Sequence, residues 1–200
     1  NQIVLGTARD NVYIPGTISA TNMGIFRNKL HNGAMRIAQR GTSATGLTGS
    51  GIYSMDRWGI FVTNGTYKVE QITLTTTDTP FLNGLLYSNR TTATTAATQA
   101  QSIFPYQGIE GLTVSDFLWG TVAGIYVTLS FWFRSNAAQG STFSAGVRTN
   151  TAAYAAYYTY NSVFTYSVTS GSWQKVVIVI PPPTFTYSAV NDNTSSMMVF

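Results

Sequence analysis

The stretch from Tyr126 to Arg134 carries the side chains best suited to binding a ligand. Its residues alternate between apolar and polar, and in a β-strand alternate residues point to opposite faces of the sheet. One face carries Tyr126, Trp132 and Arg134 among the hydroxyls of Thr128 and Ser130. A ring that covers the CH face of a sugar, beside fixed donors for its hydroxyls, is typical of sites for neutral carbohydrates. Because stacking adds only about 0.5–1.5 kcal/mol to ring burial, Trp132 is interpreted either as a binding platform or as a core residue.

A second group of aromatic residues follows between positions 154 and 166. From this group we predict Tyr154 and Tyr157 as carbohydrate-binding residues, in addition to Tyr126, Trp132 and Arg134. The alternative is that the row forms half of a sandwich core, as aromatic rows on strands commonly do. The row consists of Tyr154, Tyr158, Tyr160, Phe164 and Tyr166.

Residues that could catalyse a reaction are few. The chain has one histidine, His31, and no cysteine, so no motif supports a serine triad, a cysteine nucleophile or a thiolate metal site. Glycoside hydrolysis needs two carboxylates about 5–9.5 Å apart, and Asp56, Glu110 and Asp116 are the pairings to consider. The sequence favours a protein that is not an enzyme, with a polysaccharide depolymerase as an alternative.

The same carboxylates also have structural interpretations. Asp56 is expected to accept a hydrogen bond from a backbone amide or an arginine, and Glu110 and Asp116 are expected to fix loops. Alternation aligns Trp58 with the apolar Ile60, which predicts a buried ring and leaves a stacking platform as the alternative.

Composition narrows the range of partners. Of 200 residues, 44% are hydrophobic, enough for one ample core, and only 9% are charged, against roughly 25% in typical soluble proteins. The net charge of +4 arises from 11 basic and 7 acidic residues, without a nucleic-acid-binding motif. No apolar run reaches the roughly 18 residues that a membrane helix needs. We therefore expect neither nucleic-acid binding nor membrane insertion.

The elements that would position these residues are mostly strands. Segments rich in β-branched and aromatic residues recur between turn clusters, which predicts an all-β sandwich over residues 32–200. Residues 41–51 and 91–100 are predicted as loops, and residues 114–118 as the one short helix. The predicted strands span residues 35–40, 57–63, 67–74, 84–90, 102–110, 125–134, 142–149, 157–168, 173–180 and 195–200.

Residues 1–31 differ from the rest of the chain. Short apolar pieces such as Ile3–Leu5 and Val12–Ile14 alternate with glycine and proline, and they are too brief to form a core alone. We interpret this region as an extended β stalk or neck that is stable when identical chains associate, with a disordered leader as the alternative. The start at Asn1 and the end within a strand-like segment suggest cuts in a longer polypeptide.

Several short phrases occur in a consistent order along residues 25–200. They are Asn32-Gly33 with residues 36–42, Tyr53 with Asp56-Arg57-Trp58, residues 107–111, residues 116–121, residues 127–134, and Ser172-Trp173. This ordered set resembles the head domain of phage tail fibres and of fibre-like proteins of large DNA viruses.

The resemblance implies a jelly-roll β-sandwich similar to carbohydrate-binding modules, displayed on the virion surface. We expect it to bind a host-surface glycan for attachment, to contact other virion proteins and to form a homotrimer. Related jelly-rolls often hold a structural calcium ion, although the 7 acidic residues form no evident cluster. The alternative function is a structural spacer in the fibre or capsid that does not bind glycans.

Overall fold

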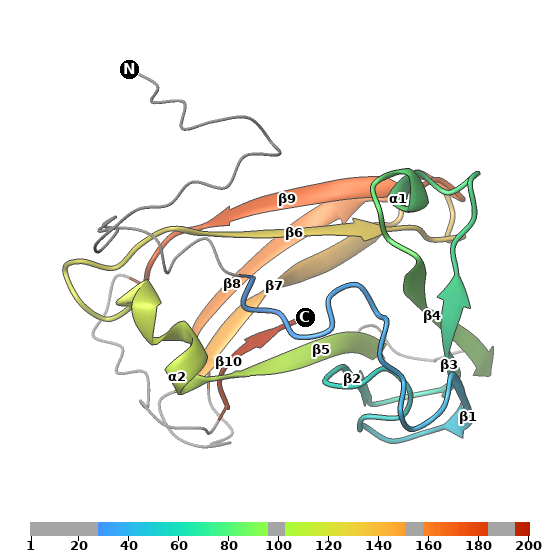
Figure 1. The fold of residues 1–200 in the computed structure, drawn as a ribbon, viewed down its shortest axis with the longest axis horizontal. Helices are drawn as coiled ribbons and strands as arrows, with labels where there is room; N and C mark the ends of the chain where they lie inside the picture. The colour runs from blue at the N-terminus through green and yellow to red at the C-terminus, as the bar shows by residue number, and fades with distance from the viewer. Residues whose placement is uncertain (1–27, 96–102, 151–157, 184–194) are drawn as a thin grey trace, which may run out of the picture.

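The computed structural model describes residues 28–95, 103–150, 158–183 and 195–200 (Figure 1). These residues form antiparallel sheets with three short helical turns, which confirms the predicted all-β class. The strands are β1 (Ser43–Leu47), β2 (Gly59–Val62), β3 (Thr66–Thr73), β4 (Tyr87–Thr95), β5 (Ile103–Glu110), β6 (Val127–Phe133), β7 (Thr142–Asn150), β8 (Tyr158–Ser167), β9 (Gln174–Ile180) and β10 (Ser195–Val199). The helical turns are α1 (Thr79–Leu82), α2 (Gly111–Val114) and the 3₁₀ turn η1 (Ser115–Phe117).

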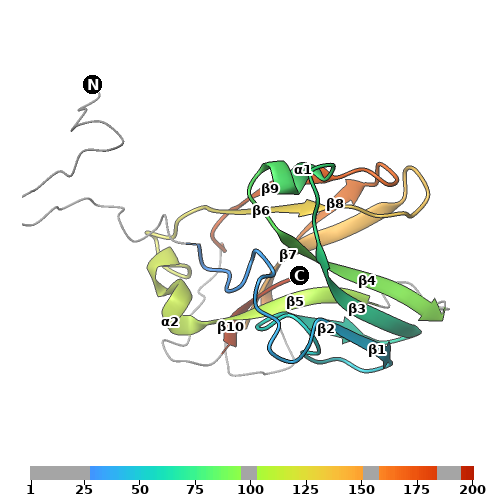
Figure 2. The same ribbon diagram turned by 45° about the vertical axis from the view of Figure 1, so that its right-hand side comes forward.

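One layer of the fold is a five-stranded sheet with the order β2-β5-β10-β7-β8. The opposing layer consists of two pieces, the β6–β9 ribbon and the three-stranded sheet β1-β3-β4, as Figures 1 and 2 show. Each piece packs its apolar face against a different part of the five-stranded sheet. The result is a sandwich, while the finer jelly-roll assignment stays a prediction.

Two clusters of buried side chains fill the space between these layers. The larger lies between the β6–β9 ribbon and strands β5, β7 and β10, and the smaller lies between β3 and β2. Strand alternation explains both clusters, because alternate residues of these strands face the space between the layers and most of them are apolar. The larger cluster includes Ile109, Leu129, Val147, Ile178 and Met197, and the smaller includes Met55, Ile60, Val62, Tyr67 and Val69.

Three predicted boundaries need correction. Residues 35–40, predicted as a strand, form turns and irregular chain, whereas β1 lies inside the predicted loop 41–51 and pairs with β3. Strand β4 continues to Thr95 within the predicted loop 91–100, because its threonines pair with β3. The helix predicted at 114–118 begins at Gly111 as α2. Pairing with β3 sets the bounds of β1 and β4, whereas local turns set the conformation of residues 35–40.

A crossing segment, defined as residues 28–40, runs between the two pieces of the opposing layer and leads into β1 (Figures 1 and 2). Lys29 forms a 2.6 Å ion pair with Asp116 in η1, and Leu30 packs against the larger core cluster. The buried side chain of Gln107 accepts a hydrogen bond from the amide of His31 and donates one to its carbonyl, each at 2.7 Å. Side chains of the head therefore hold the crossing segment in place.

Asn32 explains why the crossing segment turns instead of forming a strand. Its φ is +50°, a left-handed conformation that asparagine tolerates better than most residues. Its Oδ1 accepts from the amide of Ile37, and its Nδ2 donates to the carbonyls of Ile37 and Asp56. The predicted stalk, residues 1–31, lies outside the described residues except for 28–31, which pack on the head.

Candidate functional site

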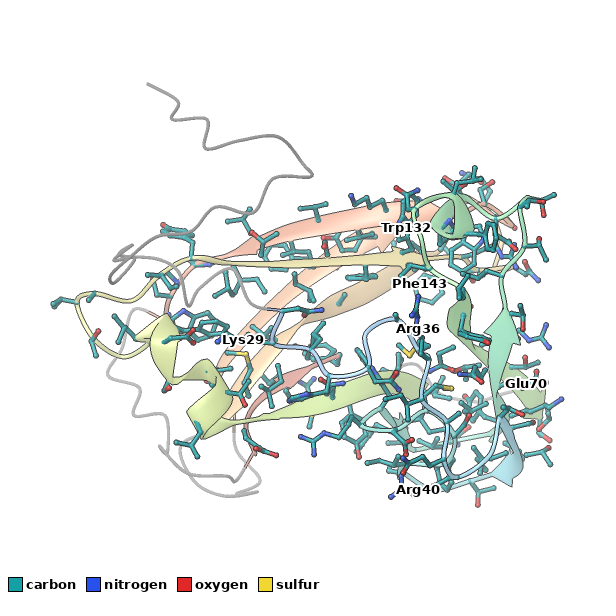
Figure 3. All side chains as sticks on the ribbon, in the orientation of Figure 1. Lys29, Arg36, Arg40, Glu70, Trp132 and Phe143 are labelled. Carbon is teal, nitrogen blue, oxygen red and sulfur yellow. The ribbon has the colours of Figure 1, made fainter. Side chains whose placement is uncertain are left out.

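The β6–β9 ribbon presents one face to the core and the other to solvent, as the alternation around Trp132 predicts. Leu129 is buried, and Val127, Phe131 and Phe133 are partly buried against the same core cluster. Trp132 points to the opposite face, pairs with Lys175 on β9, and is half-buried. It lies at the α1 end of the ribbon (Figure 3). The ring therefore belongs to the outer surface and not to the core.

Arg134 continues the outer row beyond Trp132 and completes a cluster with residues from two other segments. Its Nη1 donates to Asp78 Oδ1 at 3.1 Å, and its guanidinium carbon lies 4.8 Å from the ring centroid of Trp173. Trp173 immediately precedes β9, and its Nε1 donates to the same Asp78 oxygen at 2.9 Å. We call Asp78, Trp132, Arg134 and Trp173 the ribbon site.

Asp78 holds the ribbon site to the turn before α1. Its Oδ2 accepts hydrogen bonds from the amide of Thr75 at 2.9 Å and from the hydroxyl of Thr75 at 3.1 Å. The local sequence favours this turn, because an aspartate readily caps a turn and Pro80 suits the first helical positions of α1. The indole N–H of Trp173, followed by the Thr75 amide, lowers the pKa of Asp78 below its ordinary value. The carboxylate is thus ionised and fixed.

The geometry of the ribbon site suits binding more than acid–base chemistry. Asp78 is saturated by donors, so it positions the guanidinium of Arg134 instead of exchanging protons. The Arg134 side chain remains 37% exposed, and its planar fork can donate further hydrogen bonds to a ligand. The half-buried indole of Trp173 lies against this guanidinium, and the half-buried indole of Trp132 stands two residues earlier on the same strand face. Rings and fixed donors are therefore brought together at one place.

The predicted binding residues are only partly brought together. Trp132 and Arg134 share the ribbon site, but Tyr126 lies six residues before Trp132, about 20 Å along an extended chain. Tyr126 is 67% exposed at the opposite end of the ribbon, so it cannot contact the same monosaccharide. Tyr154 and Tyr157 lie outside the described residues, so their binding role stays a prediction. Phe164 and Tyr166 of the same aromatic row are partly buried against the larger core cluster, as the core alternative predicts.

Asp78 and Trp173 are members of the ribbon site that were not predicted from the sequence as binding residues. Trp173 occurs in one of the phrases shared with fibre heads, while Asp78 lies 56 residues from Arg134 and 95 from Trp173. Threonines precede Asp78, and Pro80 follows at the start of α1. This pattern predicts a turn, but it does not identify the distant partners of Asp78.

The other carboxylates have the structural roles expected of them. Asp56 accepts from the amide of Gln39 at 2.9 Å and from Arg40 at 3.0 Å, while Glu110 pairs with Arg57 at 3.0 Å. Asp116 pairs with Lys29. Trp58 packs against the smaller core cluster and donates to the carbonyl of Asn32, so it has a structural role, although its ring is half-buried and not fully buried as predicted.

Within the described ranges, no group of three or more histidine, cysteine, aspartate or glutamate residues is arranged to hold a metal ion. Likewise, none of the helical turns in those ranges has the length and apolar character needed to cross a membrane.

Comparison of the chain with family models, with curated proteins and with solved structures gave no match. The resemblance to viral fibre heads consequently rests on the ordered phrases of the sequence.

Proposed function

We propose that this chain is the head of a virion fibre or tail fibre and binds host-surface carbohydrate for attachment. The observation that carries the proposal is the ribbon site, where the Trp173 ring lies against the Arg134 guanidinium and Trp132 stands two residues before Arg134 on the same outer strand face. The ordered phrases that resemble viral fibre heads support the same function. No reaction is proposed, because Asp78 in the site, and Asp56 and Glu110 elsewhere on the head, are engaged in hydrogen bonds and ion pairs.

In this proposal a pyranose ring lies with its CH face on an indole while Arg134 donates to its hydroxyls. Asp78 supports the interaction indirectly, because it fixes the orientation of Arg134 and of the Trp173 ring. One stacked sugar adds about 0.5–1.5 kcal/mol beyond the burial of the ring, so a single site is weak. Linked copies in a homotrimer raise avidity by about 10²–10⁴ when several sites engage one surface.

The proposal is tested by applying the purified, labelled chain to a glycan array and to host cells. We expect Trp132→Ala to abolish retention because it removes the stacking surface, and Arg134→Ala to weaken it at least about tenfold. Melting curves followed by circular dichroism establish that the variants are folded. Retention of wild-type strength by folded Trp132→Ala would refute a role for the ribbon site.

Tyr126→Ala is the matched control, because Tyr126 is an exposed aromatic residue on the same strand face but distant from Trp132. We expect this variant to bind disaccharides and trisaccharides as the wild type does. Weaker binding of longer glycans alone would show that an extended chain lies along the whole ribbon. Release of reducing ends from a retained polysaccharide would instead identify a depolymerase.

A structural spacer is the second candidate, and one observation favours it. Val177 and Val179 are 56% and 58% exposed on the outer face of β9, and Tyr126 is exposed beside the same ribbon. Such an apolar strip would gain stability from contact with another virion protein. If no glycan is retained, and if oxidative footprinting of assembled virions shows Tyr126 protected, the spacer function is supported over attachment.

A further inference from the structure

Lys175 is an exposed lysine on the same outer face of the β6–β9 ribbon as Trp132. The two residues are direct cross-strand partners, and the Cβ atoms of such partners lie about 4.5–5.5 Å apart. Alternation on β9 buries Val176 and leaves Lys175 and Val177 facing solvent. The lysine therefore accompanies the ring that the proposed function uses as a stacking surface.

The ammonium group of Lys175 is unpaired. Among the residues that the structure describes, it forms neither an ion pair nor a side-chain hydrogen bond. Most other cations of those residues are neutralised by a carboxylate within 4.0 Å, which makes Lys175 an exception. The paired cations are Lys29, Arg40, Arg57, Lys68, Arg90 and Arg134.

The ribbon itself offers no carboxylate to Lys175. Neither β6 nor β9 contains an aspartate or a glutamate. Asp78 reaches the ribbon from the turn before α1, but its oxygens already accept hydrogen bonds from Thr75, Arg134 and Trp173. Its negative charge offsets that of Arg134, with which it pairs at 3.1 Å. The charge of Lys175 is left over, so the outer face of the ribbon is positive.

An uncompensated ammonium beside a stacking ring discriminates between charged and neutral sugars. The Trp132 ring makes no aromatic or cation–π contact within the described part of the chain, so its exposed part is open to a ligand. A neutral sugar on this ring offers Lys175 only hydroxyls. An anionic substituent offers charge-assisted hydrogen bonds, which are roughly twice as strong. Val177, 56% exposed beside Lys175 on β9, adds apolar surface that helps a ligand exclude water.

We propose that Lys175 makes the ribbon site selective for a pyranose that carries a negatively charged substituent, either a carboxylate or a sulfate. The CH face of the sugar lies on Trp132, Arg134 donates to its hydroxyls, and Nζ of Lys175 donates to the anionic group. This inference rests on the proposed function, because it names the class of sugar that the same site prefers.

The experiment measures binding of the purified full chain to immobilised probes in charged and neutral pairs. The pairs are sialyllactose with its methyl ester, trigalacturonate with its methyl ester, and sulfated lactose with lactose. Esterification removes the charge and leaves the CH faces unchanged, so the affinity ratio isolates the ionic contact. At low ionic strength we expect at least one charged probe to bind about threefold or more tightly than its neutral partner.

Variants of Lys175 separate its charge from its bulk. We expect Lys175→Gln to remove the preference for the charged probe and Lys175→Arg to keep it. Trp132→Ala should weaken binding of both members of a pair. The wild-type preference should shrink when ionic strength rises from about 0.01 M to about 1 M, because the Debye length falls from about 30 Å to about 3 Å.

Arg36→Gln is the matched control, because it changes the net charge of the chain by the same amount. Arg36 is also exposed and has no ion pair within the described ranges, but it lies on the crossing segment and not on the ribbon (Figure 3). We expect this variant to keep the wild-type preference. Melting curves establish that every variant is folded.

Failure of this inference is distinguishable from failure of the proposed function. If neutral glycans are retained through Trp132 and the charged probes bind no more tightly, selectivity by Lys175 is wrong while attachment stands. A preference that survives in Lys175→Gln, or that Arg36→Gln removes, overturns the inference equally. If no probe and no arrayed glycan is retained, both fail. A preference for the carboxylate pairs alone, or for the sulfate pair alone, supports the inference and identifies the anionic group.

Discussion

Asp78 shows how much a single residue organises in this protein. Its two carboxylate oxygens accept hydrogen bonds from Thr75, Arg134 and Trp173, and so join a turn to both strands of the ribbon. Charge-assisted hydrogen bonds of this kind are shorter and stronger than neutral ones. Asp56 acts similarly, but its donors Gln39 and Arg40 lie 17 and 16 residues away. The structural role of Asp56 was therefore foreseeable, whereas that of Asp78 was not.

The depressed pKa of Asp78 makes the stability of the head dependent on pH. Because the folded pKa lies below the ordinary value of 3.8, the stabilisation is fully present above pH 3.8 and is lost as pH falls through the folded pKa. We expect Asp78→Asn to lower the free energy of unfolding by about 1–3 kcal/mol at pH 7, since the amide nitrogen cannot accept from Thr75. Urea unfolding at pH 7 and at about pH 2 measures this difference.

The difference between wild type and Asp78→Asn should shrink at the lower pH, where the wild-type carboxyl approaches protonation. Trp173→Phe is the comparison variant, because it keeps a six-membered aromatic ring and removes the pyrrole half of the indole with its N–H donor, which is the largest cause of the lowered pKa. A destabilisation that is equal at both pH values would show that the Asp78 charge contributes nothing.

At the scale of the element, alternation predicts which way a strand faces but not which segments become strands. The outer and inner faces of β6 follow directly from its sequence. Residues 35–40 have a comparable strand-like composition, yet the turn at Asn32 and the hydrogen bonds of its side chain give them an irregular conformation. The glycine-rich residues after them become β1 because β3 offers an edge to pair with.

Gln107 is the residue through which the crossing segment is attached to β5. Its amide pairs with both backbone groups of His31 at 2.7 Å, as a neighbouring strand would. We expect Gln107→Leu to lower the free energy of unfolding by about 1–3 kcal/mol, because it leaves the amide and carbonyl of His31 without these partners. Urea denaturation followed by tryptophan fluorescence provides the measurement.

Gln139→Leu is the control for this effect, because Gln139 also accepts a hydrogen bond from a backbone amide, that of Ser170, but at an exposed position. Water can replace an exposed partner, so the expected loss is below about 0.5 kcal/mol. Equal effects of the two substitutions would mean that Gln107 does not anchor the crossing segment.

At the scale of the whole molecule, the sandwich presents two different surfaces. The β6–β9 ribbon carries the ribbon site and Lys175 on one layer, and the five-stranded sheet carries Arg148 against Phe200 on the other. The crossing segment reaches the head beside η1, where Lys29 pairs with Asp116. Residues before it, which we interpret as a stalk, would therefore join the head at that end.

The proposed stalk leads to a prediction about assembly. We expect the full chain to sediment at about three times the 21.7 kDa of one chain, because the short apolar pieces of residues 1–31 need partners to bury them. Ile14→Asp should convert the trimer to monomers by placing a charge in the shared core. Analytical ultracentrifugation measures the mass, and circular dichroism monitors the head.

Tyr126→Ala is the matched control for assembly and should remain trimeric. A wild-type chain that sediments as a monomer would contradict the stalk interpretation, and so would a trimer that Ile14→Asp leaves intact. If the wild type is a trimer and Ile14→Asp is a monomer, the variant should bind glycan surfaces with an apparent affinity about 10²–10⁴ lower than that of the wild type, because avidity is lost.

The sequence by itself determined the all-β class, the inward and outward faces of β6, and the structural roles of Asp56 and Trp58. These features depend on side-chain period and on neighbours close in the chain. Only the tertiary structure decided that Asp78 and Trp173 join Arg134, and that Lys175 stands opposite Trp132. Such contacts join residues far apart in sequence, and strand order and register, which no local pattern encodes, bring them together.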